Sequence, residues 1–294
     1  MQTFVRVVQS GSFSSVAVEM ASSQATVSKR IARLEQHLGT QLLIRHSRGQ
    51  YLTDAGKSYY VRALCLLEAL EEAENEVRSQ NYSPTGLIRV TMPTTFGRLV
   101  VLPLMDEFYQ RYPQLSVQFV LHDRVLGLLT EGLDLAIRAG ELQDSTLNAR
   151  RLGVGRYCLV ASKAYIKKYG CPQQPKDIVE HECLLYSLSQ NSRRWSFQME
   201  GKQVDVPVKA RFYADSSDFL LDAVTRGLGI AVLPNWVAHD GLASGQLVRL
   251  LDEYVQTPIP ITALYSEQQH LPQRVRVMID YFAEKIETLE LLLA

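Results

Sequence analysis

The apolar pattern of the chain changes at residues 81–86 (NYSPTG), a polar stretch that contains a proline and a glycine. Before this stretch, apolar side chains recur at helical spacing, apart from two short runs within residues 42–53. After it, strand-like runs alternate with helical segments to the C-terminus, which predicts βαβ units and a parallel sheet. The sequence therefore predicts an α+β multidomain protein in which residues 81–86 form a hinge.

The part that follows the hinge is long enough for two α/β lobes that face a cleft. Its more than 200 residues exceed one small sheet, and 46% of the chain is hydrophobic, which is enough to fill proper cores. The strands are expected at residues 87–92, 116–122, 133–140, 156–162, 183–187, 194–198, 204–213, 229–234 and 261–266. The helices are expected at residues 94–112 with an interruption at Pro103, 125–132, 216–227 and 271–292.

The segment from Ser22 to Gly39 predicts a helix with two unlike faces. Ser23 is a good N-cap, and Gly39 tolerates the left-handed backbone that ends many helices. Spacings of four, three and four residues place four apolar side chains on one inner face: Val27, Ile31, Leu34 and Leu38.

The opposite face carries side chains that suit DNA: Gln24, Thr26, Ser28, Lys29, Arg30 and Arg33. A glutamine can bond an adenine edge in two places, and lysine and arginine suit guanine or phosphate. The major groove accepts one helix of this width. An amphipathic surface helix would have the same pattern, so this segment alone leaves both interpretations open.

Two shorter helices are expected before it. Residues Thr3–Gln9 place Phe4, Val5 and Val8 at helical spacing, and Gly11 ends that helix. A second helix at residues 15–20, with Ser14 as its cap, turns Val16, Ala17 and Met20 inward. Two short helices joined by a brief turn, of which the second bears the polar face, predict a helix-turn-helix.

Residues 42–53 (LLIRHSRGQYLT) predict a small β-hairpin, or wing, around a basic tip that contains a glycine. Arg45, His46 and Arg48 lie at this tip and could reach a minor groove or the DNA backbone. A solvated basic turn is the alternative for each of them.

The net charge of zero conceals an uneven distribution. Residues 1–57 contain seven Lys or Arg and three acids, a balance of +4, whereas residues 58–80 contain two against five, a balance of −3. This asymmetry is expected if only the first segment meets phosphate.

A long helix is expected from Thr53, its cap, to about Gln80. A period of 3.5 over about three heptads favours a coiled-coil seam. The seam residues are Tyr59, Ala63, Leu66, Leu70, Ala73 and Val77. A second copy of the chain is the simplest partner, so we expect a homodimer rather than packing within the chain.

Several other classes of protein find little support. The chain lacks an apolar run of the roughly 18 residues that cross a bilayer and a secretion signal at its start, so we expect a cytoplasmic protein without a membrane partner. We also expect no catalytic or metal site and no cofactor, because the sequence has no nucleophile turn, phosphate loop or metal-ligand spacing. An enzyme with a two-lobed cleft and a solute carrier are therefore weaker alternatives.

The cysteines have no Cys-x-x-Cys spacing and no zinc-like spacing with histidine. Buried thiols in a reducing compartment are favoured over a redox switch. The four residues are Cys65, Cys158, Cys171 and Cys183.

The motifs GSFS, SQATVS, RIARLEQHLG, QLLIRHSR and LTDAG occur in the order and at the spacing of the LysR-type transcriptional regulators. GLIRV, RYPQLSVQF, EGLDLAIRAG, LVASKAY, RGLGIAVLP and GQLVRLL resemble the effector domain of that family. The resemblance covers the whole chain and is specific because the motifs occur together.

The resemblance implies a winged helix-turn-helix at residues 1–57, a dimerising linker helix at 58–80, and an effector-binding domain at 87–294 with a periplasmic-binding-protein-like fold. Subdomain I is expected at about 87–161 and 267–294, and subdomain II at about 162–266. Double-stranded DNA, further copies of the chain in a homodimer or homotetramer, and RNA polymerase are the expected partners.

The resemblance also implies site residues. At the DNA it places Gln24, Ala25, Ser28, Lys29 and Arg33, with Arg45 or Arg48 on the wing. Between the subdomains it places an effector near Thr94, Thr95, His122, Asp123, Arg138, Ser216 and Ser217.

The chemistry expected between the subdomains favours a small organic anion. Thr94 and Ser216 stand at expected helix starts beyond strands, where free amides attract anions, although such hydroxyls also serve simply as caps. Arg138 could hold a carboxylate in two-point fashion or pair with Asp134 or Asp144. Four aromatic side chains could form an apolar wall or belong to the core: Phe96, Tyr186, Trp195 and Phe219.

Overall fold

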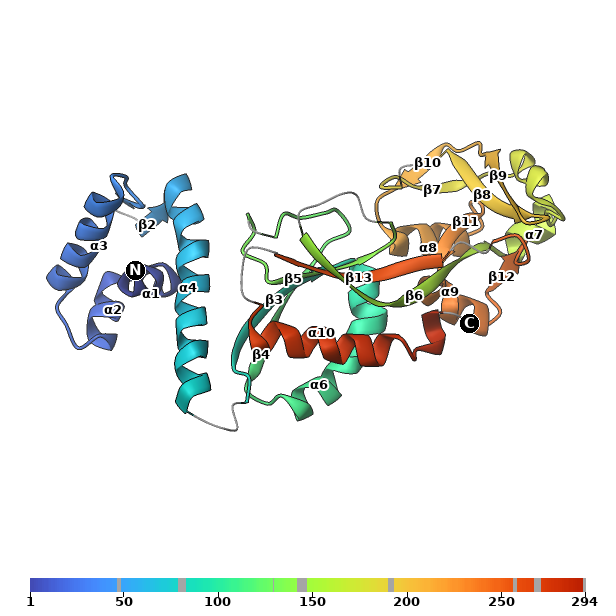
Figure 1. Ribbon diagram of the computed structural model, residues 1–294. Coiled ribbons are helices and arrows are strands. Elements are labelled where there is room, and N and C mark those ends of the chain that lie inside the picture. Colours follow the sequence, from blue (N-terminus) through green and yellow to red (C-terminus); the bar gives the residue numbers. More distant parts are fainter. Residues whose placement is uncertain are drawn as a thin grey trace. The chain divides into compact units, whose positions relative to one another are not determined.

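The computed structural model describes residues 1–46, 49–78, 83–128, 130–141, 147–189, 193–255, 258–266 and 271–292 (Figure 1). The chain divides into two units, one of Met1–Ser83 with Leu129–Gly132 and one of Pro84–Leu128 with Leu133–Ala294. The division between Ser83 and Pro84 lies inside residues 81–86. No helix among the described residues is both long and apolar enough to cross a membrane.

The N-terminal unit is a helix-turn-helix followed by a wing and a long helix, as the sequence predicts. Its elements are α1 (Gln2–Ser10), α2 (Phe13–Glu19), α3 (Gln24–Leu38), β1 (Leu43–His46), β2 (Gly49–Leu52) and α4 (Asp54–Arg78). The strands pair antiparallel, with Leu43 opposite Leu52.

The ends of α3 are those that the sequence predicts. The Ser23 hydroxyl accepts from the amide of Thr26, and Gly39 ends the helix with a φ of 65°. The prediction that Leu38 faces inward is wrong, because this last helical residue is 37% exposed. Of the expected inner face, only Val27 and Ile31 are fully buried. The last turn of α3 extends beyond the core of the N-terminal unit, so the buried face does not reach the end of the helix.

The cap of α2 is also corrected. Ser12, not Ser14, accepts the amide of Ser15, at 3.2 Å, so the helix begins at Phe13. Ser12 has the extended backbone of an N-cap, with φ −144° and ψ 121°, whereas Ser14 already lies inside the helix.

The first turns of α4 belong to the core of the N-terminal unit. Phe4 is fully buried, and its ring centroid lies 5.6 Å from that of Tyr59. Ala63 is 1% exposed and packs in the same cluster. Tyr59 and Ala63, which the spacing assigns to a dimer seam, therefore pack against residues of the same chain.

The second unit is built on a mixed sheet. The described strands form a seven-stranded sheet in the order β11-β6-β13-β5-β3-β4, with β12 also paired to β6. These strands are β3 (Gly86–Met92), β4 (Leu115–Leu121), β5 (Leu135–Ala139), β6 (Leu147–Ser162), β11 (Ala231–Pro234), β12 (Leu247–Leu250) and β13 (Pro258–Ser266).

Only part of this sheet is parallel. β3 pairs parallel with β4 and β5, whereas β13 runs antiparallel to both β5 and β6. The expected parallel sheet is thus correct for the strands nearest the hinge. The 16-residue β6 pairs with β13 over Leu147–Arg156 and with β11 and β12 beyond that (Figure 1).

β6 and β13 therefore join two lobes. The first lobe contains β3, β4, β5, α5 (Thr94–Phe96), a π-helix (Gly97–Val101), a 3-10 helix (Leu102–Leu104), α6 (Met105–Arg111) and α10 (Gln273–Ile286). The second lobe contains β11, β12, α7 (Lys163–Tyr169), a 3-10 helix (Pro175–Glu180), β7 (Leu184–Tyr186), β8 (Arg194–Met199), β9 (Lys202–Pro207), β10 (Phe212–Ala214), α8 (Ser217–Thr225) and α9 (Asn235–Ala243). A last 3-10 helix covers Glu290–Leu292.

Three expectations for this unit change. The helix expected at 125–132 is wrong, because its described residues are turns and irregular backbone, in which Leu128 packs into a small cluster. The single strand expected at 204–213 is two strands, since β9 returns along β8 while β10 pairs with β7. The helix expected at 94–112 with an interruption at Pro103 runs without a break from Thr94 to Arg111 and changes type at Gly97, Leu102 and Met105.

Two of the four cysteines follow the expectation of buried thiols. Cys158 and Cys183 are buried free thiols, and burial raises the pKa of each to about 12. Cys171 is exposed, so the expectation of a buried thiol is wrong there. The side chain of Cys65 lies outside the described residues.

His181 supplies a pH-dependent element in the second lobe. It is 8% exposed, and its Nδ1 lies 3.2 Å from the hydroxyl of Tyr165, which accepts from the amide of Glu182. Burial lowers the pKa of His181 below its ordinary value of 6.5. The folded protein therefore binds fewer protons than the unfolded chain once the pH falls through about 6.5.

We predict that His181→Gln loses less thermal stability than the parent protein between pH 7.5 and pH 5.5. The parent loses stability on acidification because its folded state resists protonation of His181. Melting temperatures across this range measure the effect. Identical curves for His181→Gln and the parent protein would contradict the prediction.

Candidate functional site

The outer face of α3 presents the side chains that the sequence assigns to DNA. Ser28 is half-buried, and the other six are exposed: Gln24, Ala25, Thr26, Lys29, Arg30 and Arg33. Val27 and Ile31 anchor the opposite face in the core. The helix therefore offers a continuous polar and basic surface on a rigid support.

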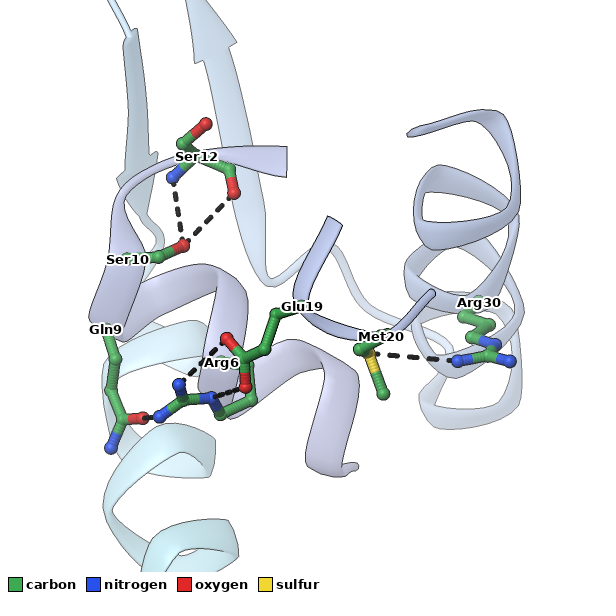
Figure 2. A network of polar contacts seen from close by, with 7 residues as sticks. All are labelled: Arg6, Gln9, Ser10, Ser12, Glu19, Met20 and Arg30. Carbon is green, nitrogen blue, oxygen red and sulfur yellow. Dashed lines mark hydrogen bonds and ion pairs between the residues drawn. The ribbon is translucent and has the colours of Figure 1, made fainter. Parts of the chain in front are cut away.

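Two other cations of the N-terminal unit are neutralised within the chain. Arg6 makes two bonds to the Glu19 carboxylate, at 2.7 and 2.8 Å, and a third to Gln9 (Figure 2). This pairing raises the pKa of Arg6 and lowers that of Glu19. Lys57 lies 3.2 Å from Asp54.

The positive charge that remains is concentrated on α3 and the wing. In the part of the chain that the structure describes, no ion pair is found for Lys29 or Arg33. Arg30 directs one guanidinium nitrogen to the sulfur of Met20, at 3.8 Å, and stays exposed (Figure 2). Among the described side chains of residues 1–57, the basic charge that is not in an ion pair therefore lies on α3.

The wing is present, but its tip is not described. Arg45 lies in β1 opposite Gln50, and His46 lies opposite Gly49. The side chain of Arg45 and the whole of Arg48 fall outside the described residues. Their contact with DNA stays a prediction.

The exposed large apolar side chains in the described part of α4 lie beyond Ala63. Leu66 and Leu70 are 61% and 57% exposed. The side chains of Ala73 and Val77 fall outside the described residues. Since Tyr59 and Ala63 pack inside the unit, Leu66 and Leu70 are the described part of the seam that a partner could cover.

A cavity of about 260 Å³ lies between the two lobes of the second unit. Its lining is mainly apolar and includes five aromatic residues: Tyr157, Tyr186, Trp195, Phe197 and Trp236. Thr95, Asp123 and Ser217, which the resemblance assigns to the effector, also line it. Thr94, His122, Arg138 and Ser216 do not.

The expected anion sites at two helix starts are occupied by the chain itself. The Asp123 carboxylate accepts from the amide of Thr94 at 2.8 Å, and the Ser216 hydroxyl accepts from that of Phe219 at 3.3 Å. The capping role is therefore the correct interpretation of Ser216.

Arg138 braces the loop that carries Asp123. It is buried and donates to the carbonyls of His122 and Arg124, each at 3.4 Å. Burial lowers the pKa of its guanidinium. The expected pair with Asp134 is wrong, because Asp134 accepts from the amide of Arg89 and faces Arg274, while Asp144 lies outside the described residues.

Two ion pairs join the lobes beside the cavity. Arg98 lies 2.6 Å from Asp218, and Arg124 lies 3.2 Å from Asp215. Asp218 follows Ser217, which lines the cavity, and Asp215 lies two residues before it. Because all four side chains are partly exposed, each pair contributes only about 0–1 kcal/mol.

Of the four aromatic residues considered for an apolar wall or the core, two line the cavity and one lies in the core. Tyr186 and Trp195 line the cavity, whereas Phe96 is buried with its ring centroid 5.5 Å from that of Trp236. Phe219 is 58% exposed and stacks on Phe212, so neither the wall nor the core describes it.

Sequence reasoning missed much of the cavity. Arg194 and Ser196 come from the β8–β9 hairpin, and Tyr157 comes from β6. The motif GIAVLP predicts the strand that ends at Val232–Pro234, and this strand end does line the cavity. The hairpin has no comparable local signal, since its position depends on long-range packing.

Comparison with known proteins is consistent along the whole chain. The family model described as "Bacterial regulatory helix-turn-helix protein, lysR family" matches residues 1–57, and the model described as "LysR substrate binding domain" matches residues 82–287. The chain belongs to the LysR-type transcriptional regulators. These are regulators of transcription and not enzymes.

Curated LysR-type relatives match nearly the full chain. A probable HTH-type transcriptional regulator LtrA of Klebsiella pneumoniae is 35% identical and covers 97% of this chain and 94% of its own. The HTH-type transcriptional activator AaeR of Escherichia coli is 34% identical over 97% of this chain and 93% of its own.

Solved structures of full-length relatives agree. CrgA of Neisseria meningitidis, a LysR-type regulator, has a TM-score of 0.63 at 31% identity, with 97% of both chains covered. AphB of Vibrio cholerae, described as a virulence activator, has a TM-score of 0.60 at 28% identity, with 96% and 97% covered.

We predict that Arg33→Ala weakens binding to DNA and reduces the slope of log affinity against log salt by about 1, because one phosphate contact is lost. Arg6→Ala is the matched control. Its guanidinium is already paired with Glu19, so it should leave the salt slope unchanged. Titration of a labelled duplex at four salt concentrations measures both slopes, and equal slopes for Arg33→Ala and the parent would exclude the contact.

Proposed function

We propose that this protein binds specific DNA sequences as a dimer and that a small organic molecule in the inter-lobe cavity alters the geometry of that binding. The observation that supports this most is the basic outer face of α3, where no ion pair of Lys29 or Arg33 is found among the described residues, while Arg6 and Lys57 are paired within the chain. The DNA-contacting residues proposed are Gln24, Ala25, Thr26, Ser28, Lys29, Arg30, Arg33, Arg45 and Arg48.

Residues 1–57 would contact DNA, residues 58–80 would pair two copies, and residues 81–86 would connect them to the effector domain. The exposed Leu66 and Leu70 support pairing through α4. Assembly of dimers into a tetramer and contact with RNA polymerase complete the proposal, which places the protein with the DNA in the cytoplasm.

The effector proposed is a small organic anion with an apolar body. The five aromatic residues suit a carbon skeleton, and Arg194 is a cation in the described lining. Asp123 also lines the cavity, but its carboxylate already accepts the Thr94 amide. The negative charge of the effector would therefore be bound by Arg194 and not by free amides at helix starts.

The chemistry of such a regulator is binding alone. An effector that prefers one arrangement of the lobes shifts the equilibrium between DNA-binding geometries by no more than its differential affinity for them. The Arg98–Asp218 and Arg124–Asp215 pairs are weak enough to break or form within that limit.

Selection of bound duplexes from a random DNA library tests the proposal directly. A dimer with two-fold symmetry should recover an interrupted palindrome. Footprints on the selected duplex, with and without pools of small organic acids, then test the effector. Recovery of no preferred sequence would refute the specific DNA binding, and unchanged footprints with every pool would refute the control by an anion.

We predict that Ser217→Phe abolishes the response to an active pool while DNA binding without the pool stays within about twofold of the parent. The added ring occupies the cavity that Ser217 lines. Asp222→Phe, on the exposed side of the same helix, is the control and should respond normally. A normal response by Ser217→Phe would place the effector elsewhere.

We predict that Leu70→Asp dissociates the dimer, because it introduces an unpaired charge into an apolar seam. Sedimentation equilibrium should show a smaller mass than for the parent. Arg62→Asp introduces the same charge at another exposed position of α4 and should leave the mass unchanged. An unchanged mass for Leu70→Asp would contradict pairing through this helix.

A further inference from the structure

Recognition helix α3, the wing and helix α4 meet at the peptide groups of Leu42 and Leu43. Both residues are buried, at 1% and 4% exposure, so their amides need partners inside the protein. Leu42 precedes β1 and is outside the β1–β2 register. The Glu35 carboxylate supplies the missing acceptor, because its Oε1 takes the amide of Leu42 at 2.8 Å and that of Leu43 at 3.1 Å.

The same short segment is held from its other side by the start of α4. The carbonyl of Leu42 accepts from the amide of Thr53 at 3.0 Å, and the Thr53 hydroxyl donates to the carbonyl of Gln41 at 2.7 Å. That hydroxyl also caps α4 by accepting from the amide of Gly56 at 2.9 Å. A Cβ at Gly56 would lie 2.1 Å from the Leu42 oxygen, so only glycine allows this approach.

The position of Glu35 in α3 is unfavourable by itself. It lies in the last turn, where the helix dipole disfavours a carboxylate. It is half-buried and points to the wing segment rather than to the outer face that carries Lys29 and Arg33. Its two bonds to strand-start amides account for a carboxylate at this position.

We propose that Glu35 is a positioning residue for DNA recognition. Through one carboxylate oxygen it fixes α3 to the segment Gln41–Leu43, which Thr53 in turn fixes to α4. In the dimer that the proposed function requires, α4 sets the distance between two DNA-binding units, so the angle between α3 and α4 decides whether both recognition helices reach their half-sites. The inference rests on that proposed function.

The test uses full-length Glu35→Ala and Glu35→Gln. The glutamine keeps an oxygen that can accept both amides but removes the charge, whereas alanine removes both. Each variant is titrated with a duplex that the parent protein selects from a random library and with a random-sequence duplex of equal length. Only the first duplex requires alignment of both recognition helices.

Glu35→Ala should bind the selected duplex about tenfold more weakly, which is the effect of misaligning one base contact. Glu35→Gln should stay within about twofold of the parent. Both variants should bind the random duplex at least as tightly as the parent, since each removes a negative charge near phosphate.

Full affinity of Glu35→Ala for the selected duplex would overturn the proposal. An equal loss in Glu35→Gln would also overturn it, because charge and not the two bonds would then matter. An equal loss of Glu35→Ala on both duplexes would overturn it as well, since that result indicates a damaged domain rather than a misaligned helix.

A hydrogen-exchange measurement without DNA tests this inference independently of the proposed function. Hydrogen exchange of the peptide that covers residues 40–46 should accelerate in Glu35→Ala but not in Glu35→Gln, while α1 stays protected in both. If the parent selects no motif, sequence-specific recognition fails and the exchange still decides the contact. Unchanged exchange in Glu35→Ala would overturn the proposed fixation of α3.

Discussion

Backbone amides at the starts of strands and helices need acceptors, and in this protein side chains provide several of them. Glu35 serves the start of the wing, Asp123 serves Thr94, and Thr53 serves the start of α4. Each bond satisfies a donor that burial or helix geometry leaves unpaired, and each also fixes one element to another. The same requirement thus shapes the DNA-contact unit and the wall of the cavity.

The N-terminal unit is largely predictable because its signals are local. Ser23, Gly39 and Thr53 mark helix ends in the sequence itself, and the spacing of Val27 and Ile31 reveals the buried face. The failures come from tertiary contacts. Tyr59 and Ala63 fit a heptad seam, but they pack against the Phe4 ring and its neighbours in the same chain. Periodicity along one helix cannot reveal such contacts.

The cavity is less predictable for the same reason. Thr95 and Ser217 follow from strand ends and helix starts, whereas Arg194 lines the cavity from the β8–β9 hairpin, whose place in the fold no local pattern reveals. The anion sites predicted at the two helix starts were wrong. A free amide and a capped amide have the same local sequence, and only the position of Asp123, 29 residues away from Thr94, distinguishes them.

The 16-residue strand β6 has a mechanical consequence for the effector domain. Because one continuous strand, bonded to β13 at one end and to β11 and β12 at the other, passes through both lobes, the lobes cannot separate without breaking ladder bonds. The pairing of β6 with β13 is regular on both sides of a single register shift between Ile261 and Thr262. The continuous strand therefore restricts relative movement of the lobes to changes that preserve its ladder bonds.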